Sequence, residues 1–232
     1  MFRRLVVRPT VQTRSMFIQT ETTPNPHSLK FTPGVEVLPE EYGTGMYFEK
    51  HQAKDIQKSP LAKALFAVDG IKGVFFAREV ITITKTTDAT WNLLKPQVFT
   101  EVLNFYGSED PRVMLDAADS DAVSDTTILD TDSEVVAMIK ELMETRVRPA
   151  VQDDGGDIFF EGFDENTGIV KVRLAGSCVG CPSSSITLRN GVENMLQHYI
   201  AEVKGIEEVG NEDDDAVYDS EMKLSYTPNT HA

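Results

Sequence analysis

An interruption of the hydrophobic pattern in the middle of the chain constrains the fold more than any other feature. Between Gly107 and Asp130 acidic residues dominate, large apolar residues are few, and Arg112 is the only basic residue. Such a segment cannot bury enough apolar surface to offset the entropy that ordering it would cost, so it predicts a solvated, flexible acidic linker over 107–130. We therefore expect two small domains, one over 17–106 and one over 131–209.

Strand and helix signals alternate in the first of these regions. Residues 80–84 alternate between apolar and polar side chains, which predicts a strand. Ser59 and Pro60 are typical of a helix N-cap followed by proline in the first turn, and Gly70 is typical of a helix end. A second helix is predicted over 91–105, because large apolar residues recur there at spacings of three and four.

The second region predicts a helix, a hairpin and a further helix. The letters TDSE at 131–134 have the form of a capping box, and Pro149 is expected to stop the helix that follows. Two strand-like runs, 158–163 and 169–174, predict a β-hairpin. A last helix is expected from Pro182 to about residue 203, before an acidic, disordered tail over 210–232. The expected fold class is therefore mixed, α+β or α/β, with a hairpin-containing sheet packed on helices in the C-terminal domain.

The N-terminal segment 1–16 differs in charge from the rest of the chain. It has no acidic residue, and its arginines lie among apolar and hydroxyl-bearing side chains: Arg3, Arg4, Arg8 and Arg14. This composition predicts a mitochondrial transit peptide over 1–16 and a location in the mitochondrial matrix. An ordinary flexible basic tail is the alternative that the pattern leaves open.

Charge and cysteine content exclude several classes of protein. A net charge of −15 is unfavourable for nucleic-acid binding, which needs a basic surface, so we expect no nucleic-acid partner. No apolar run approaches the roughly 18 residues that span a bilayer, so we expect no membrane partner. Two cysteines cannot form the disulfide framework of a small secreted domain, and they are therefore expected to act as thiolates.

These two cysteines, Cys178 and Cys181, are the candidate metal-binding and cofactor-binding residues. They lie at C-x-x-C spacing, between a predicted strand and the helix expected from Pro182, and this spacing lets both sulfurs approach one metal centre. A helix N-terminus lowers the pKa of a nearby thiol and favours the thiolate that binds metal. No catalytic residue is predicted.

The spacing alone leaves three interpretations open. A thioredoxin-like dithiol pair also lies between a strand and a helix, but the chain after the motif is short for the rest of that fold. A structural zinc ion takes four protein ligands, and the histidines show no matching spacing, although two chains could share a zinc ion. An iron–sulfur cubane is commonly held by four thiolates, which two chains related by a two-fold axis would supply.

Longer motifs resemble a known family. The letters DGGD at 154–157 and LAGSCVGCPSS at 174–184 closely resemble the C-terminal domain of NifU-type iron–sulfur scaffolds. The first region resembles the N-terminal domain of the mitochondrial Nfu branch. That match is carried by TPNP at 23–26, LKF at 29–31, SPLA at 59–62, VITITK at 80–85 and Trp91.

The resemblance implies a carrier protein rather than an enzyme. It would bind a 4Fe–4S cluster between protomers through Cys178 and Cys181, and the cluster would bridge a homodimer or higher oligomer. Clients would be apo iron–sulfur proteins such as lipoyl synthase, aconitase-like enzymes and respiratory-complex subunits, and other cluster-assembly factors would be partners. A thioredoxin-like dithiol oxidoreductase and an inter-chain zinc-binding protein are the alternatives.

Overall fold

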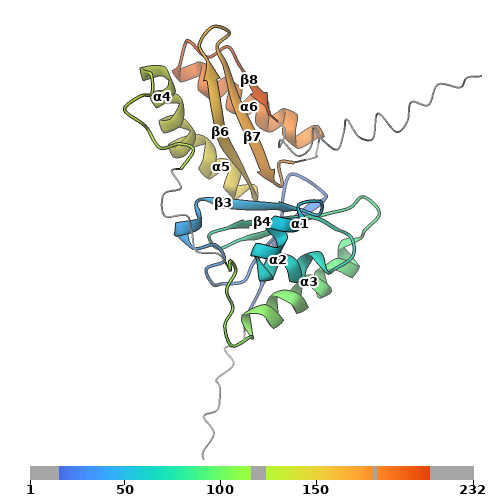
Figure 1. The fold of residues 1–232 in the computed structure, drawn as a ribbon. Helices are drawn as coiled ribbons and strands as arrows, with labels where there is room; N and C mark the ends of the chain where they lie inside the picture. The colour runs from blue at the N-terminus through green and yellow to red at the C-terminus, as the bar shows by residue number, and fades with distance from the viewer. Residues whose placement is uncertain (1–15, 116–123, 180–181, 210–232) are drawn as a thin grey trace, which may run out of the picture.

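The computed structural model describes residues 16–115, 124–179 and 182–209. In these ranges the chain forms two sheets, each packed on helices around a hydrophobic core of its own (Figure 1). The mixed α+β class expected from the sequence is confirmed. We refer to residues 16–115 as the N-terminal part and to the described residues between 124 and 209 as the C-terminal part.

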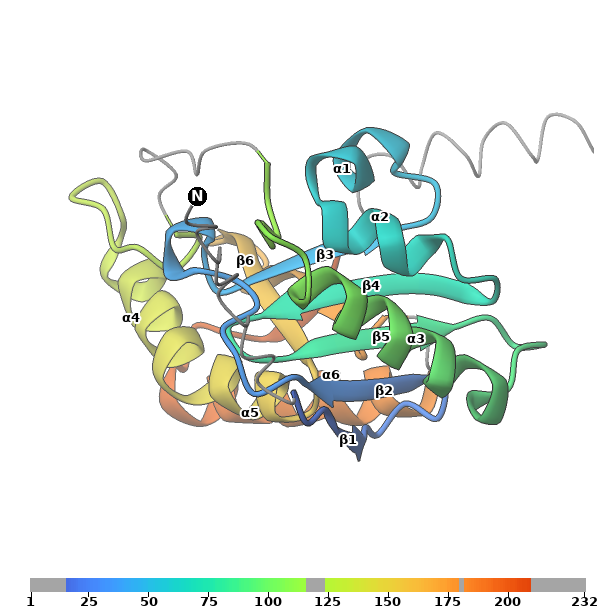
Figure 2. The same cartoon turned by 90° about the horizontal axis from the view of Figure 1, so that it is seen from below.

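The N-terminal part is an antiparallel sheet with helices on one face. Its five described strands follow the spatial order β1-β2-β5-β4-β3. The strands are β1 (Gln19–Thr22), β2 (Ser28–Thr32), β3 (Gly45–Glu49), β4 (Ile71–Ala77) and β5 (Ile81–Lys85). The helices α1 (Ala53–Lys58), α2 (Pro60–Phe66) and α3 (Trp91–Tyr106) lie on the same side of this sheet (Figure 2), and the short 3-10 helix η1 (Glu40–Tyr42) precedes β3.

Both faces of this sheet are covered. Ile81 and Ile83 of β5 belong to the core beneath the helices. Their neighbours Thr82 and Thr84 are on the other face, because successive strand residues point to opposite sides, and they are buried as well. In Figure 2 the C-terminal part lies behind that second face, and β7 makes close approaches to β3, β4 and β5.

The C-terminal part is a small sheet packed on helices. A helical stretch comes first, made of α4 (Glu134–Leu142), the π-helical turn η2 (Met143–Val147) and α5 (Arg148–Asp153). The expected hairpin follows as β6 (Gly156–Asp164) and β7 (Ile169–Gly176). Then α6 (Pro182–Tyr199) returns the chain to β8 (Gly205–Glu208), which pairs in parallel with β7 and gives the strand order β6-β7-β8.

Three local predictions were wrong. Pro149 does not stop the helix, because the π-helical turn before it lets the proline occupy the first turn of α5. The cap of α4 is Ser133 rather than residue 131, and its hydroxyl accepts a hydrogen bond from the Val136 amide at 3.4 Å. The last helix ends at Tyr199 instead of about residue 203, since the chain turns there into the unpredicted strand β8.

The acidic segment 107–130 is more ordered at its two ends than its composition suggests. Val113 and Met114 are buried against the core of the N-terminal part. Asp125 forms an ion pair with Arg148 in the C-terminal part. Residues 116–123, the leader up to residue 15 and the tail 210–232 lie outside the described residues. Among the helices that are described, none has the length and apolar character to cross a membrane.

Candidate metal centre

Cys178 lies two residues after the end of β7. The strand ends at Gly176, and the backbone amide of Ser177 then donates to the Gly155 carbonyl at 3.2 Å. This bond ties the cysteine loop, residues 177–179, to the glycine turn before β6. Gly176 has a φ of +68°, a left-handed conformation that favours glycine and turns the chain out of the strand.

The structure locates one of the two predicted ligands. Cys178 is buried, with 5% of its surface exposed. Cys181 lies outside the described residues, so its distance from Cys178 stays a prediction. The helix expected from Pro182 is present as α6. Among the described residues, no group of three or more histidine, cysteine, aspartate or glutamate side chains is arranged to hold a metal ion.

The pKa of the Cys178 thiol is raised, whereas the sequence predicted that it would be lowered. Burial raises the pKa of its thiol from the ordinary 9.0 to about 12, and the nearby charges of Asp154 and Asp157 act in the same direction. A hydrogen bond with the Ser177 hydroxyl, at 4.0 Å, opposes this rise but does not cancel it. Cys178 is therefore a thiol at neutral pH in this structure, and it must gain solvent or a metal ion before it becomes a thiolate.

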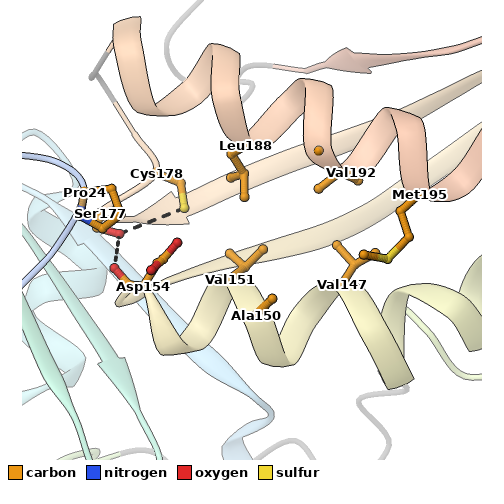
Figure 3. A pocket seen from close by; sticks show the side chains of 11 residues that line it. Pro24, Val147, Ala150, Val151, Asp154, Ser177, Cys178, Leu188, Val192 and Met195 are labelled. Carbon is orange, nitrogen blue, oxygen red and sulfur yellow. Dashed lines mark hydrogen bonds between the residues drawn. The ribbon is translucent and has the colours of Figure 1, made fainter.

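An apolar pocket of about 490 Å³ opens beside this thiol. It lies between the helical stretch η2–α5 and α6, and Figure 3 shows the Cys178 side chain at one end of it. The pocket is lined by Pro24, Val147, Ala150, Val151, Asp154, Ser177, Cys178, Leu188, Gly191, Val192 and Met195. Most of these side chains are apolar, so a ligand that entered the pocket beside the thiol would meet mainly apolar groups.

Two buried polar residues were not among the predicted site residues, and one of them, Asn25, bonds to the cysteine loop. Asn25, in the turn between β1 and β2, donates from its side-chain amide to the Ser177 carbonyl at 2.9 Å. Arg148, with 2% of its surface exposed, forms ion pairs with Asp125, Glu144 and Asp157. Asn25 belongs to the TPNP letters and Arg148 directly precedes Pro149, and neither pattern indicates a contact between distant segments.

Asp157 is the buried acid of this region. Burial raises the pKa of its carboxyl above the usual 3.8, while Arg148, whose Nε lies 3.3 Å from Oδ1, acts against the rise. Its Oδ2 accepts hydrogen bonds at 3.2 Å from the Thr44 hydroxyl and from the Gln152 amide. These partners account for the carboxylate as a structural group that joins β6 to α5 and to the N-terminal part.

The chain is similar to known proteins along most of its length. Two family models match it: "Scaffold protein Nfu/NifU N terminal" over residues 18–109, and "NifU-like domain" over residues 139–207, a range that includes both cysteines. NifU-like protein 5, mitochondrial, from Arabidopsis thaliana is 54% identical over 85% of this chain and 69% of its own length. NFU1 iron-sulfur cluster scaffold homolog, mitochondrial, from Drosophila sechellia is 51% identical over 93% of this chain and 72% of its own length.

A solved structure is also similar. The solution NMR structure of a NifU-like protein from Saccharomyces cerevisiae matches 43% of this chain and 84% of its own, at 25% identity and a TM-score of 0.39. Both family models and both relatives, which are 54% and 51% identical to this chain over most of its length, agree. The chain belongs to the Nfu/NifU family of iron–sulfur cluster scaffolds.

Proposed function

We propose that this protein binds a 4Fe–4S cluster between two copies of itself, through Cys178 and Cys181 of each chain, and delivers it to apoproteins. The number of thiols carries this proposal. The chain contains two cysteines, while a cubane cluster is commonly held by four thiolates. Two chains related by a two-fold axis would provide all four at their interface.

The cellular setting follows from the relatives. Those named above are called mitochondrial, and the arginine-bearing leader over 1–16 fits import into the mitochondrial matrix. We propose domains over 17–106 and 131–209, with the acidic segment 107–130 between them. The clients would be lipoyl synthase, aconitase-like proteins and respiratory-complex subunits, reached together with other cluster-assembly factors. The protein is a carrier rather than an enzyme, because the cluster is its cargo.

Delivery would proceed by ligand exchange. A client thiolate forms a bond to a cluster iron, the bond from that iron to Cys178 or Cys181 breaks, and the released thiolate takes up a proton. If a chelator that traps free iron abolished transfer, ligand exchange would be the wrong mechanism.

Anaerobic reconstitution with iron and sulfide tests the proposal. We expect broad absorption in the blue part of the visible spectrum, a dimeric mass, and about two irons per chain, as one 4Fe–4S cluster between two chains requires. Cys178→Ala should lose the colour and the dimer together. Asn92→Ala, an exposed change on α3, is the control and should keep both.

Other outcomes distinguish the alternatives. A colourless dimer that contains zinc would indicate an inter-chain zinc protein, and reduction of a test disulfide by a colourless protein would indicate a dithiol oxidoreductase. A protein that stays monomeric and free of iron under these conditions would contradict the proposal.

A further inference from the structure

One side chain of the N-terminal part holds the cysteine loop from both sides of Cys178. The Asn25 amide nitrogen Nδ2 donates to the Ser177 carbonyl at 2.9 Å and approaches the Val179 carbonyl at 3.4 Å. Its Oδ1 accepts from the backbone amide of His27 at 2.9 Å, which fixes the turn that carries it. Asn25 has 1% of its surface exposed, so these bonds are shielded from water.

The contact extends away from the loop along the second face of the sheet. The Lys30 ammonium on β2 donates to the Asp153 carbonyl at the end of α5, at 2.8 Å. Thr44 and Asp157 are bonded at 3.2 Å across the same boundary. Gly176 packs so closely on the Phe75 ring that a Cβ there would lie 3.0 Å from the ring carbon Cγ.

This boundary is more polar than either core. The buried face of β5 presents threonines to it, and among the described residues the Thr82 hydroxyl is one of the buried groups without a hydrogen-bond partner. Polar boundaries between parts of one chain resemble transient protein interfaces, and relative motion is their ordinary behaviour. The N-terminal part can therefore separate from the cysteine loop at a lower cost than the opening of either hydrophobic core.

A cluster shared by two chains cannot form on the loop as it is held. The Cys178 sulfur would have to reach a centre that a second copy also reaches, whereas here the residue is 5% exposed. Pro24, next to Asn25, lines the pocket beside the thiol, so the β1–β2 turn itself is part of what encloses Cys178. Movement of that turn would therefore uncover one side of Cys178.

We propose that the N-terminal part is a cover for Cys178, held closed by Asn25, which must leave the cysteine loop before the loop binds a cluster. This inference rests on the proposed function and specifies how its site is regulated. The closed form keeps the thiol away from oxidants and stray metal, and the open form presents it to a second chain. Because only the open form binds the cluster, cluster binding shifts the population toward it.

Thiol alkylation of the full chain, carried out without any cluster, measures how accessible the Cys178 thiol is. In a Cys181→Ser background Cys178 is the only cysteine, so the uptake of N-ethylmaleimide reports its exposure alone. Asn25→Asp preserves the size of the side chain and the Oδ1 acceptor for His27, but it points a carboxylate at the two carbonyl oxygens. We expect this change to speed labelling at least about tenfold, since it removes the donor and leaves buried acceptors unpaired.

Two further variants make the result specific. Lys30→Met removes a bond of the cover that does not touch the cysteine loop, and it should speed labelling in the same direction. Asn92→Ala on the exposed side of α3 should leave the rate unchanged within about twofold, as distant surface substitutions usually do. In the chain with both cysteines, Asn25→Asp should also shorten the time for colour to develop during anaerobic reconstitution.

Three results would contradict the proposed cover. These are labelling of Asn25→Asp at the parental rate, an increase in labelling no larger than its loss of global stability in urea explains, or faster labelling with an unchanged rate of cluster formation. Failure of the proposed function looks different. In that case no variant binds iron, while the labelling rates still report whether Asn25 closes the loop.

Discussion

The Cys178 sulfur lies against the backbone of Gly156 on β6. A Cβ at that position would clash with the sulfur and would lie 2.7 Å from the Ala175 carbonyl oxygen. Gly155 beside it has a φ of +81°, which strains any residue with a side chain. The two glycines of the DGGD letters therefore do more than form the predicted turn, because they also make the space in which the thiol is buried.

Burial of this thiol makes folding stability depend on alkaline pH. The folded-state pKa of Cys178 is raised to about 12 from 9.0, so above pH 9 the unfolded chain releases a proton that the folded chain retains. Stability should then fall as pH rises through this window. Between pH 8 and pH 11 the parent should lose about 2–3 kcal/mol more than Cys178→Ala in urea unfolding followed by circular dichroism. Equal slopes for the two proteins would show that the thiol is hydrated.

Part of this site could be predicted from the sequence because its determinants are local. The C-x-x-C spacing, the strand before it and the helix from Pro182 all lie within one short stretch. The contact of Asn25 with Ser177 joins residues 152 positions apart, and no local pattern encodes such a pairing. For Cys178 the predicted fall in thiol pKa was wrong for the same reason, since segments distant in sequence contribute to the burial that raises it.

At the scale of elements, Pro149 shows how a correct local rule gave a wrong boundary. A proline ring clashes with the carbonyl four residues before it, which ordinarily ends a helix. Here the π-helical turn Met143–Val147 precedes Arg148 and Pro149, and its wider spacing takes that carbonyl out of the usual register. Strand β8 was missed for another reason: its four residues pair in parallel with β7 and carry no alternating pattern of their own.

The Ser59 cap is the element-scale feature that ties the acidic segment to the N-terminal part. Its hydroxyl accepts from the Ala62 amide at 3.1 Å and donates to the Val113 carbonyl at 2.6 Å, with the residue fully buried. Ser59→Ala should cost about 2–4 kcal/mol, because it removes a helix cap and leaves a buried carbonyl without its donor.

Ser133 on α4 is the matched control for this cap. Its hydroxyl makes a longer bond of 3.4 Å and is only partly buried, so Ser133→Ala should cost at most about 1 kcal/mol. Urea unfolding of both variants gives the comparison. Equal losses would mean that the Val113 bond contributes nothing beyond capping.

On the scale of the whole molecule, a network of charges connects segments that are distant in sequence. Arg148 on α5 donates to Asp125 at 2.7 and 2.6 Å and to the Ile158 carbonyl at 3.1 Å, and it also pairs with Glu144. Asp157, which also pairs with Arg148, contacts Thr44 of the N-terminal part. One guanidinium thus joins the end of the acidic segment, the helical stretch and the β6 strand that meets the other sheet.

Removal of this guanidinium should show how much it contributes to the free energy of unfolding. Arg148→Met leaves the Asp157 carboxylate buried without its counter-charge, which typically costs about 3–5 kcal/mol at pH 7. Arg173→Met removes a partly exposed arginine paired with Glu161 and should cost about 0–1 kcal/mol, so it separates burial from the loss of an ion pair.

The loss of stability in Arg148→Met should depend on pH, and this dependence decides whether the buried Asp157 charge causes the loss. Burial already raises the Asp157 pKa above 3.8, and loss of Arg148 removes the main opposing charge, so the folded-state pKa rises further. Below that pKa the carboxyl is neutral and no charge is buried. The loss of stability relative to the parent should therefore be largest at pH 7 and smaller at pH 5. Urea unfolding at both pH values measures it. A deficit that stays constant or grows on acidification would assign it to lost packing around Arg148, and the charge network would then be incidental to the way the two parts are joined.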